Sequence, residues 1–173
     1  MTYRTTYASP VGLLTLAGDG THLTGLWPEG HRYFGSTLTE SAGERDDLPV
    51  FAAARSWLDR YFNGMRPPVG ELPLALSGTP FQQMIWSLLA QIPYGTVVTY
   101  GDLDRQAAAL TGKPSMSAQA VGGAVGRNPV SIIVPCHRVI GSNGSLTGYA
   151  GGLPMKLHLL EHEGIDLSRC FLP

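Results

Sequence analysis

The chain has 173 residues, and 12 Lys and Arg against 13 Asp and Glu give it a formal net charge of −1. That length fits one domain or two small ones, and a hydrophobic content of 43% excludes a disordered chain. No apolar run is long enough to cross a membrane, and no basic stretch followed by an apolar one opens the chain, so we expect no membrane association, no secretory signal and a cytoplasmic location.

The first part of the chain predicts a small antiparallel sheet. Turn residues separate three strand-like runs, at 3–8, 11–17 and 22–27. Residues 28–48 show no periodicity and predict a loop.

A helix and a linker are predicted next. Apolar residues recur at helical spacing from Val50 to Phe62, and Gly64 ends that pattern. Residues 65–78 are rich in proline and glycine and predict a linker with one edge strand. We therefore place a domain boundary near Gly78.

The second part of the chain predicts three helices, each with a capping residue at its start. They are expected at 80–92, 99–110 and 118–126. Thr79, Thr99 and Ser117 are the caps. The last two helices, joined by a polar turn, indicate helix-turn-helix geometry, although that turn is longer than usual.

The third of these helices contains Gly122 and Gly123 in its interior. Glycine there costs about 1 kcal/mol relative to alanine. We therefore expect another backbone to approach this face, either that of a neighbouring helix or that of a nucleic acid.

The chemistry is predicted to lie around Cys136, after an apolar, strand-like run at 130–134. Pro135 fixes a turn that presents the cysteine, His137 adds a titratable base, and Arg138 adds a fixed positive charge. Such surroundings lower the pKa of a thiol and produce a nucleophilic thiolate. The alternative is a small buried hydrophobic residue, which is the commoner role of a cysteine in that position.

Several motifs occur in one order along the chain, at 9–12, 81–86, 92–95, 99–101, 133–140, 148–152 and 159–164. Together they resemble the O6-alkylguanine-DNA alkyltransferases. The resemblance implies an α+β fold, with a ribonuclease H-like scaffold domain over 1–78. It also implies a mostly helical domain with a helix-turn-helix over 79–173, which would bind DNA and carry out alkyl transfer.

The function implied by this resemblance is direct repair of DNA. A monomer would bind duplex DNA through the minor groove and flip an O6-alkylguanine out of the stack. It would then move the alkyl group irreversibly onto its own cysteine, once per molecule, with no cofactor and no metal.

The resemblance also implies roles for five residues. Cys136 would accept the alkyl group, His137 would take the thiol proton through a water, and Glu163 would orient the histidine. Tyr100 would donate a hydrogen bond to the flipped guanine. Asn128 would brace the turn between the recognition helix and the active-site strand.

Further residues are expected to contact DNA or line the pocket: Ala118, Gln119, Gly122, Gly123, Arg127, Arg138, Val139, Tyr149 and Ala150. Two of them depart from the family pattern. Gln119 stands where many members carry an intercalating arginine, and Ala150 stands where some carry a serine.

The chemistry of the transfer agrees with these residues. Displacing guanine from an alkyl carbon needs a soft anionic nucleophile and a donor to the leaving base, which Cys136 with His137 and Tyr100 can supply. The thioether product has no carbonyl for water to attack. Two alternatives remain: a module that binds alkylguanine without repairing it, and a Cys-His acyl hydrolase.

The charge is unevenly distributed. The stretch 105–160 contains no Asp or Glu and five basic residues, namely Arg105, Lys113, Arg127, Arg138 and Lys156. This +5 segment leaves −6 for the rest of the chain. We expect at most five phosphate contacts, modest DNA affinity and a shallow salt dependence.

Overall fold

The computed structural model describes residues 1–173, and they form two compact units. The first comprises Met1–Ser77 with Pro129–Ile133, and the second comprises Gly78–Asn128 with Val134–Pro173. None of the helices has the length and apolar character needed to span a membrane.

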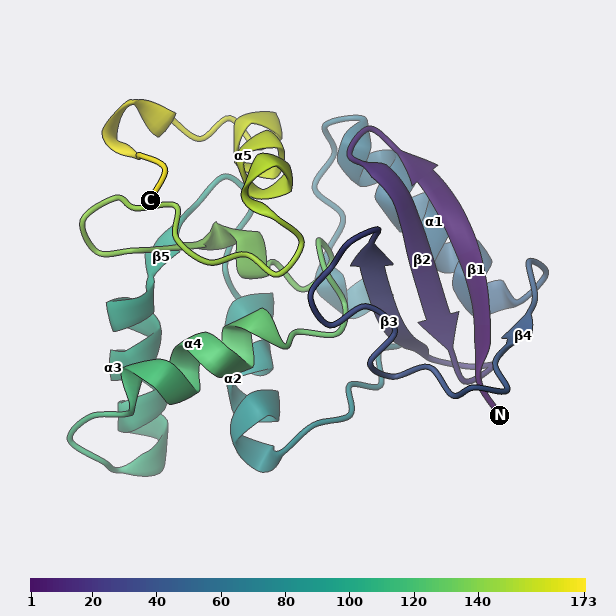
Figure 1. Ribbon diagram of the computed structural model, residues 1–173, viewed down its shortest axis with the longest axis horizontal. Coiled ribbons are helices and arrows are strands. Elements are labelled where there is room, and N and C mark those ends of the chain that lie inside the picture. The colour runs from purple at the N-terminus through teal and green to yellow at the C-terminus, as the bar shows by residue number, and fades with distance from the viewer. The chain divides into compact units, whose positions relative to one another are not determined.

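The elements follow one another along the chain as shown in Figure 1. They are β1 Tyr3–Ser9, β2 Gly12–Gly18, β3 Leu23–Pro28, β4 Gly43–Glu44, α1 Pro49–Phe62, the 3-10 helix η1 Val69–Glu71, α2 Pro80–Ala90, β5 Val98–Thr99, α3 Tyr100–Thr111, α4 Ala118–Gly126, the 3-10 helix η2 Cys136–Arg138, β6 Val139–Ile140, α5 Leu153–His162 and the 3-10 helix η3 Leu167–Arg169. The predicted mixed α+β class is confirmed.

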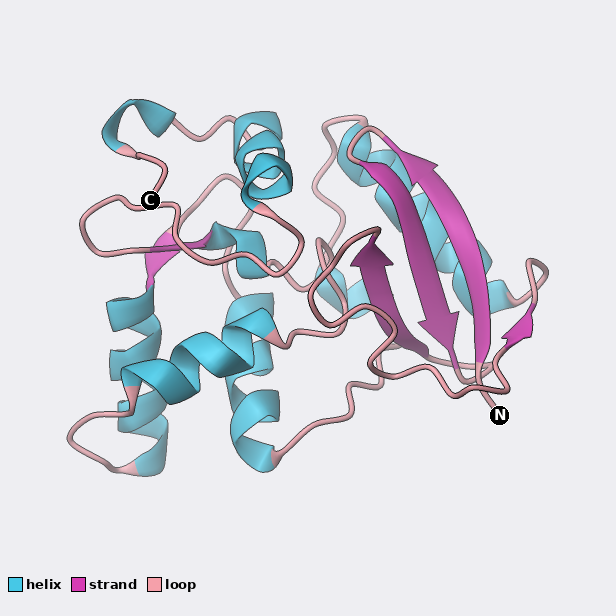
Figure 2. Ribbon diagram, viewed as in Figure 1, coloured by secondary structure: helices cyan, strands magenta, loops and turns pink.

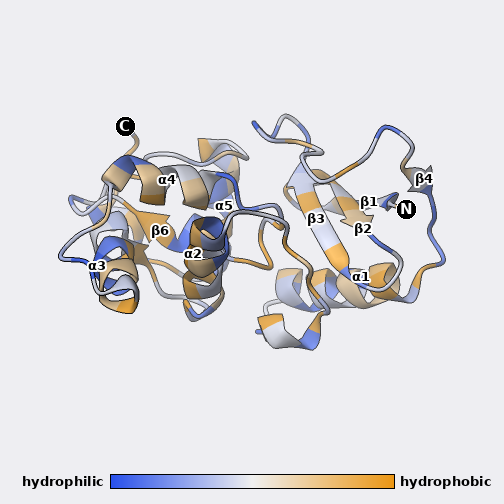
Figure 3. Ribbon diagram, turned by 90° about the horizontal axis from the view of Figure 1, so that it is seen from below, coloured by the Kyte–Doolittle hydropathy of each residue, from blue (hydrophilic) through white to orange (hydrophobic).

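The first unit is a four-stranded sheet in the order β3-β2-β1-β4, with α1 packed on one face (Figure 1). The predicted strands and helix are confirmed to within two residues. The helix buries an aromatic stripe, Phe51, Trp57 and Tyr61, at helical spacing. Figure 3 shows the resulting alternation of apolar and polar residues along α1.

Two features of the first unit were not expected in detail. The segment 28–48 contains the two-residue strand β4, which pairs in parallel with β1. The edge strand predicted in 65–78 is reduced to a single bridge between Leu23 and Leu74. Both pairings join residues distant in sequence, so local patterns carry little signal for them.

The second unit contains the three predicted helices, and α4 packs against both α2 and α3 (Figure 1). Thr79 and Thr99 each form a reciprocal capping box, with Gln82 and with Asp102. The hydroxyl of Ser117 accepts from the backbone N–H of Ala120, 3.3 Å away. Local chemistry therefore sets where all three helices begin. The first ends at Ala90, two residues before the predicted end.

The strand predicted at 130–134 is wrong. Only Val130 pairs, through a single bridge to Leu26, and the chain then turns (Figure 2). Ile133 N–H donates to the carbonyl of Ser131 at 2.8 Å across Ile132, whose φ is +70°. A positive φ is costly for a β-branched residue and persists only where the surroundings enforce it. Complete burial of this run explains its apolar composition without a strand.

Candidate active site

Cys136 begins η2 directly after a tight turn. Its backbone N–H donates to the carbonyl of Val134 at 2.9 Å, and Pro135 lies between them with φ −84° and ψ 63°. The side chain of Asn128 donates to the same carbonyl at 2.8 Å. This proline turn and Asn128 fix the backbone that carries the thiol. Cys136 is only 7% exposed.

The electrostatic surroundings of Cys136 differ from the expectation. Burial raises the pKa of the thiol, and this effect outweighs the stabilisation of the thiolate by hydrogen bonds from Asn128 and Tyr149 and by the charge of Lys156. The prediction of a thiol pKa lowered by its sequence neighbours is therefore wrong. The resting side chain is a protonated thiol.

His137 lies beside the cysteine in sequence and is completely buried. Its Nε2 is 2.5 Å from Oε2 of Glu163. Because the carboxylate is the acceptor, Nε2 carries the proton and Nδ1 keeps its lone pair. Burial lowers the pKa of His137 more than Glu163 raises it, so the imidazole is neutral. No protein group bonds to Nδ1.

Glu163 is held by a second partner, Arg138. The guanidinium donates through Nε to Oε1 at 2.7 Å and through Nη2 to Oε2 at 3.1 Å, and through Nη1 to the carbonyl of Ile92 at 2.6 Å. The backbone N–H of Gly95 also donates to Oε1 at 3.0 Å. Burial opposes ionisation of Glu163, but the bonds from His137 and Arg138 prevail and hold its pKa well below the usual range.

This pairing changes the role of Arg138. Its side chain is 7% exposed and is committed to Glu163, so the guanidinium supports the site from behind and is not available to a DNA phosphate. Its position two residues after Cys136 in sequence does not indicate that its side chain pairs with Glu163.

The resemblance places the substrate pocket against the segment 141–152, which we call the pocket loop. The hydroxyl of Tyr100 lies 3.5 Å from the carbonyl of Thr147 and 3.4 Å from that of Gly148. Burial raises the pKa of Tyr100 to about 12, so the phenol remains a hydrogen-bond donor. Tyr149 favours the thiolate of Cys136, and Ala150 follows it, half-buried.

Lys156 is a site residue that the sequence reasoning did not single out. Its ammonium is completely buried and donates to the carbonyl of Val139 at 2.5 Å, with the carbonyls of Thr147 and Gly148 at 3.4 and 3.5 Å. Burial lowers its pKa to about 8, although the charge of Cys136 opposes this shift. Helical spacing places Lys156 on the buried face of α5 with Leu159 and Leu160. A lysine on an apolar helical face is the signal that could have identified it.

The predicted recognition residues form a different surface, on α4. Ala118, Gln119, Gly123 and Arg127 are exposed and Gly122 is half-buried. Apart from the adjacent backbone of α4 itself, no atom of this chain lies within 4 Å of a Cβ built at Gly122 or Gly123. The neighbouring helix considered above therefore does not account for these two glycines, and their face is open.

The two surfaces are connected through the chain. The opposite face of α4 is anchored by Trp86, whose Nε1 donates to the carbonyl of Ala124 at 2.8 Å. Asn128, two residues after the last residue of α4, is the side chain that braces the turn before Cys136. No group of three or more His, Cys, Asp or Glu side chains is arranged to hold a metal ion.

Comparison with known proteins covers nearly the whole chain. The family model for the 6-O-methylguanine DNA methyltransferase ribonuclease-like domain matches residues 2–76, and that for the DNA binding domain of the same family matches residues 80–165. A methylated-DNA–protein-cysteine methyltransferase of Haemophilus influenzae is 44% identical over 163 residues, covering 94% of this chain and 87% of the relative. One of Mycobacterium leprae is 46% identical over 155 residues, covering 90% and 88%.

Solved structures agree with this result. Mycobacterium tuberculosis OGT in complex with DNA has a TM-score of 0.80 and 41% identity, covering 97% of this chain and 94% of that one. The resemblance inferred from the motifs is thus confirmed over both parts of the sequence. The chain belongs to the 6-O-methylguanine DNA methyltransferase family and is an enzyme of the methylated-DNA–protein-cysteine methyltransferase class.

Proposed function

We propose that this protein repairs duplex DNA by moving the alkyl group of an O6-alkylguanine onto Cys136. The observation that carries the proposal is the buried Glu163–His137 pair, which leaves the imidazole Nδ1 free to act as a base for the protonated thiol of the preceding residue. The α4 surface would contact the minor groove, and the first unit would act as a scaffold for the second. In this reading the protein acts as a monomer.

The proposed reaction is one in-line substitution. The thiol proton moves through a water to Nδ1 of His137, and Glu163 stabilises the imidazolium that results. The sulfur of Cys136 then bonds to the alkyl carbon while the carbon–O6 bond breaks. The electron pair of that bond stays on the guanine, which takes up the equivalent of the proton that the thiol released, passed on from the His137 imidazolium through solvent, and remains in the DNA as the normal base.

The raised thiol pKa fits this order of events. A thiolate produced only when the base is bound is not exposed to other electrophiles in the resting protein. Asn128, Tyr149 and Lys156 all favour the anion once it forms, so they stabilise the charge that the proton transfer creates. Tyr100 donates a hydrogen bond to the guanine and keeps its proton, because its pKa is raised.

The DNA-binding role is supported by the composition of the exposed α4 face. Small residues there allow a helix to lie deep in a narrow groove, which offsets the cost of interior glycine. Gln119 lies at the start of this face, where it can fill the space left by a flipped base.

A stoichiometry experiment tests the proposed function. The protein is incubated with a growing excess of duplex containing O6-methylguanine, and restored guanine is counted. We expect a plateau at one repaired base per protein molecule, because a thioether cannot be hydrolysed. Continued repair beyond one equivalent would contradict single transfer, and no repair would contradict the function itself.

The glutamine at 119 leads to a prediction for the DNA complex. Gln119→Arg adds a charge at the start of the exposed α4 face, so we expect it to retain or raise the rate of transfer to DNA and to steepen the salt dependence by about one phosphate. Gln91→Arg, at the exposed end of α2, is the control for added charge alone. A marked loss of transfer in Gln119→Arg only would show that position 119 has another role.

The salt dependence of DNA binding is expected to be shallower than the sequence indicated. Of the five basic residues in 105–160, Arg138 and Lys156 are buried, which leaves Arg105, Lys113 and Arg127 exposed. We expect the logarithm of the binding constant to fall with the logarithm of salt concentration with a slope no steeper than about −3. Titrations at several salt concentrations measure it, and a slope near −5 would contradict the assignment.

A further inference from the structure

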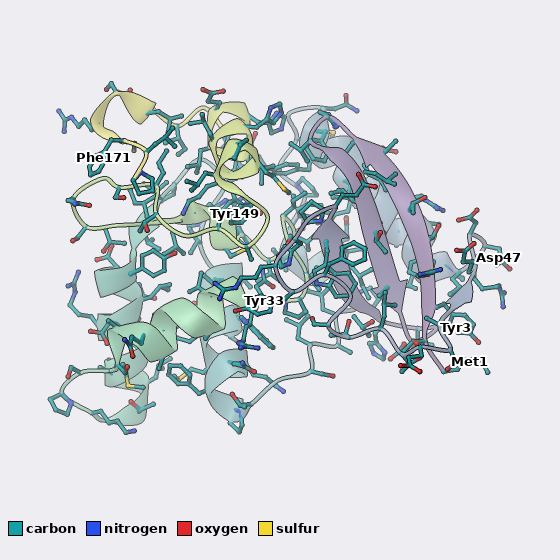
Figure 4. All side chains as sticks on the ribbon, in the orientation of Figure 1. Met1, Tyr3, Tyr33, Asp47, Tyr149 and Phe171 are labelled. Carbon is teal, nitrogen blue, oxygen red and sulfur yellow. The ribbon has the colours of Figure 1, made fainter.

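The C-terminal tail, 167–173, pairs with the pocket loop. The backbone N–H of Phe171 donates to the carbonyl of Gly144 at 3.1 Å, and the N–H of Leu146 donates to the carbonyl of Phe171 at 2.9 Å. Together they make a parallel bridge between Ser145 and Phe171. Figure 4 labels Phe171 on the tail and Tyr149 on the loop.

Side chains strengthen this pairing. Leu146 is buried in a cluster with Ile140 and Leu160, and Leu167 and Cys170 of the tail pack against that cluster. The tail approaches so closely that a Cβ on Gly144 would overlap the carbonyl oxygen of Arg169. Gly144 also has a φ of +89°, so glycine is required there for two reasons.

The next residues of the same loop face the reacting groups. The carbonyls of Thr147 and Gly148 accept from Lys156 and Tyr100, and the next residue, Tyr149, favours the thiolate of Cys136. The pocket loop is therefore held at two adjacent places. The tail fixes 144–146, and the buried lysine and tyrosine fix the residues that line the pocket.

We propose that the C-terminal tail is a positioning element that sets the place of the Tyr149 wall and thereby the size of the alkyl group that Cys136 accepts. This inference rests on the proposed function. Releasing 144–146 gives the wall freedom to move outward. The rate of methyl transfer then falls, because a small group must be held by close packing. The rate of transfer of a bulky group rises, because the pocket has more space for it.

Two shortened chains test the proposal. A chain ending at Arg169 lacks both tail hydrogen bonds, whereas a chain ending at Phe171 keeps them. Rates of transfer are measured from O6-methylguanine and O6-benzylguanine in the same duplex. The loss of two hydrogen bonds leads us to expect about a tenfold rise in the benzyl-to-methyl rate ratio for the shorter chain and no change for the longer one.

A point variant in the full chain provides a second measurement, which tests the role of the tail if the shorter chain does not fold. Gly144→Ala should raise the same ratio by excluding the tail. Gly112→Ala is its control, because Gly112 also has a positive φ, of +70°, but has no neighbour within 4 Å.

The outcomes are distinct. A raised ratio in the shorter chain or in Gly144→Ala, but not in the controls, supports the proposal. An unchanged ratio, even with both rates lowered together, would mean that the tail only stabilises the fold and would overturn it. Absence of methyl transfer by the full chain would instead overturn the proposed function on which the inference rests.

Discussion

Replacing Glu163 by glutamine is expected to slow methyl transfer about a hundredfold to ten-thousandfold, the range associated with loss of a positioned acid–base group. The carboxylate fixes the tautomer of His137 through a 2.5 Å contact and stabilises the imidazolium formed when the thiol loses its proton. Glutamine keeps the shape but provides no charge. Single-turnover kinetics with excess protein and lesion duplex measure the effect.

The same substitution is expected to destabilise the fold. Arg138 would remain buried without its carboxylate partner, a change that typically costs about 3–5 kcal/mol. Because the pKa of Glu163 is held low, the pair stabilises the protein above the ordinary carboxyl pKa, and this contribution is lost as the pH falls through the folded-state value. The free energy of unfolding of Glu163→Gln should therefore depend less on pH in the acid range than that of the unchanged protein.

Glu161→Gln is the matched control for Glu163→Gln. It removes a carboxylate from the last turn of α5, two residues before Glu163, but Glu161 is exposed. We expect Glu161→Gln to behave like the unchanged protein in both assays. Transfer by folded Glu163→Gln at a rate close to that of the unchanged protein would show that His137 needs no carboxylate.

Replacing Lys156 by methionine is expected to raise the pKa of Cys136 further and to slow transfer at neutral pH about tenfold, which corresponds to about 1.4 kcal/mol. Lys156 is the positive charge that favours the thiolate, and methionine keeps most of its length while removing that charge. The pH dependence of alkylation by iodoacetamide, in a Cys170→Ser background, reports the thiol without DNA. Its profile should move to higher pH.

Other groups that titrate near Lys156 bear on this pH experiment. Cys136 and His137 interact with its charge from η2, Cys170 does so from the tail, and Tyr100 shares its carbonyl acceptors. Lys113→Met, which removes the other lysine from an exposed turn, is the control and should leave the profile in place. An unmoved profile in Lys156→Met would leave the lysine with a purely structural role.

Three helices of the second unit, α2, α3 and α4, were predictable because their signals are local, whereas α5 was not predicted. At Thr79 and Thr99 the residues that cap the helix lie within one turn of its start, so the capping boxes appear directly in the sequence. The proposed acceptor cysteine and its histidine also follow from motifs in an uninterrupted stretch of chain.

The parts that could not be predicted depend on residues far apart in sequence. The sequence predicts Arg138 as a charge beside Cys136, but it pairs with Glu163, 25 residues on. The apolar run 130–134 has the composition of a strand, but a completely buried turn favours the same apolar residues. The raised pKa of Cys136 follows from burial, which neighbouring residues in sequence do not determine.

The central claim is that Cys136 receives the alkyl group, and the mass of its peptide tests this most directly. The folded protein is exposed to duplex DNA containing O6-methylguanine, digested and mapped. We predict that the peptide containing Cys136 gains the mass of one methyl group in place of one hydrogen, and that the Cys170 peptide does not change. Cys136→Ser should show no methylated peptide. An unmodified Cys136 peptide after guanine has been restored, or a methyl group on Cys170, would contradict the assignment.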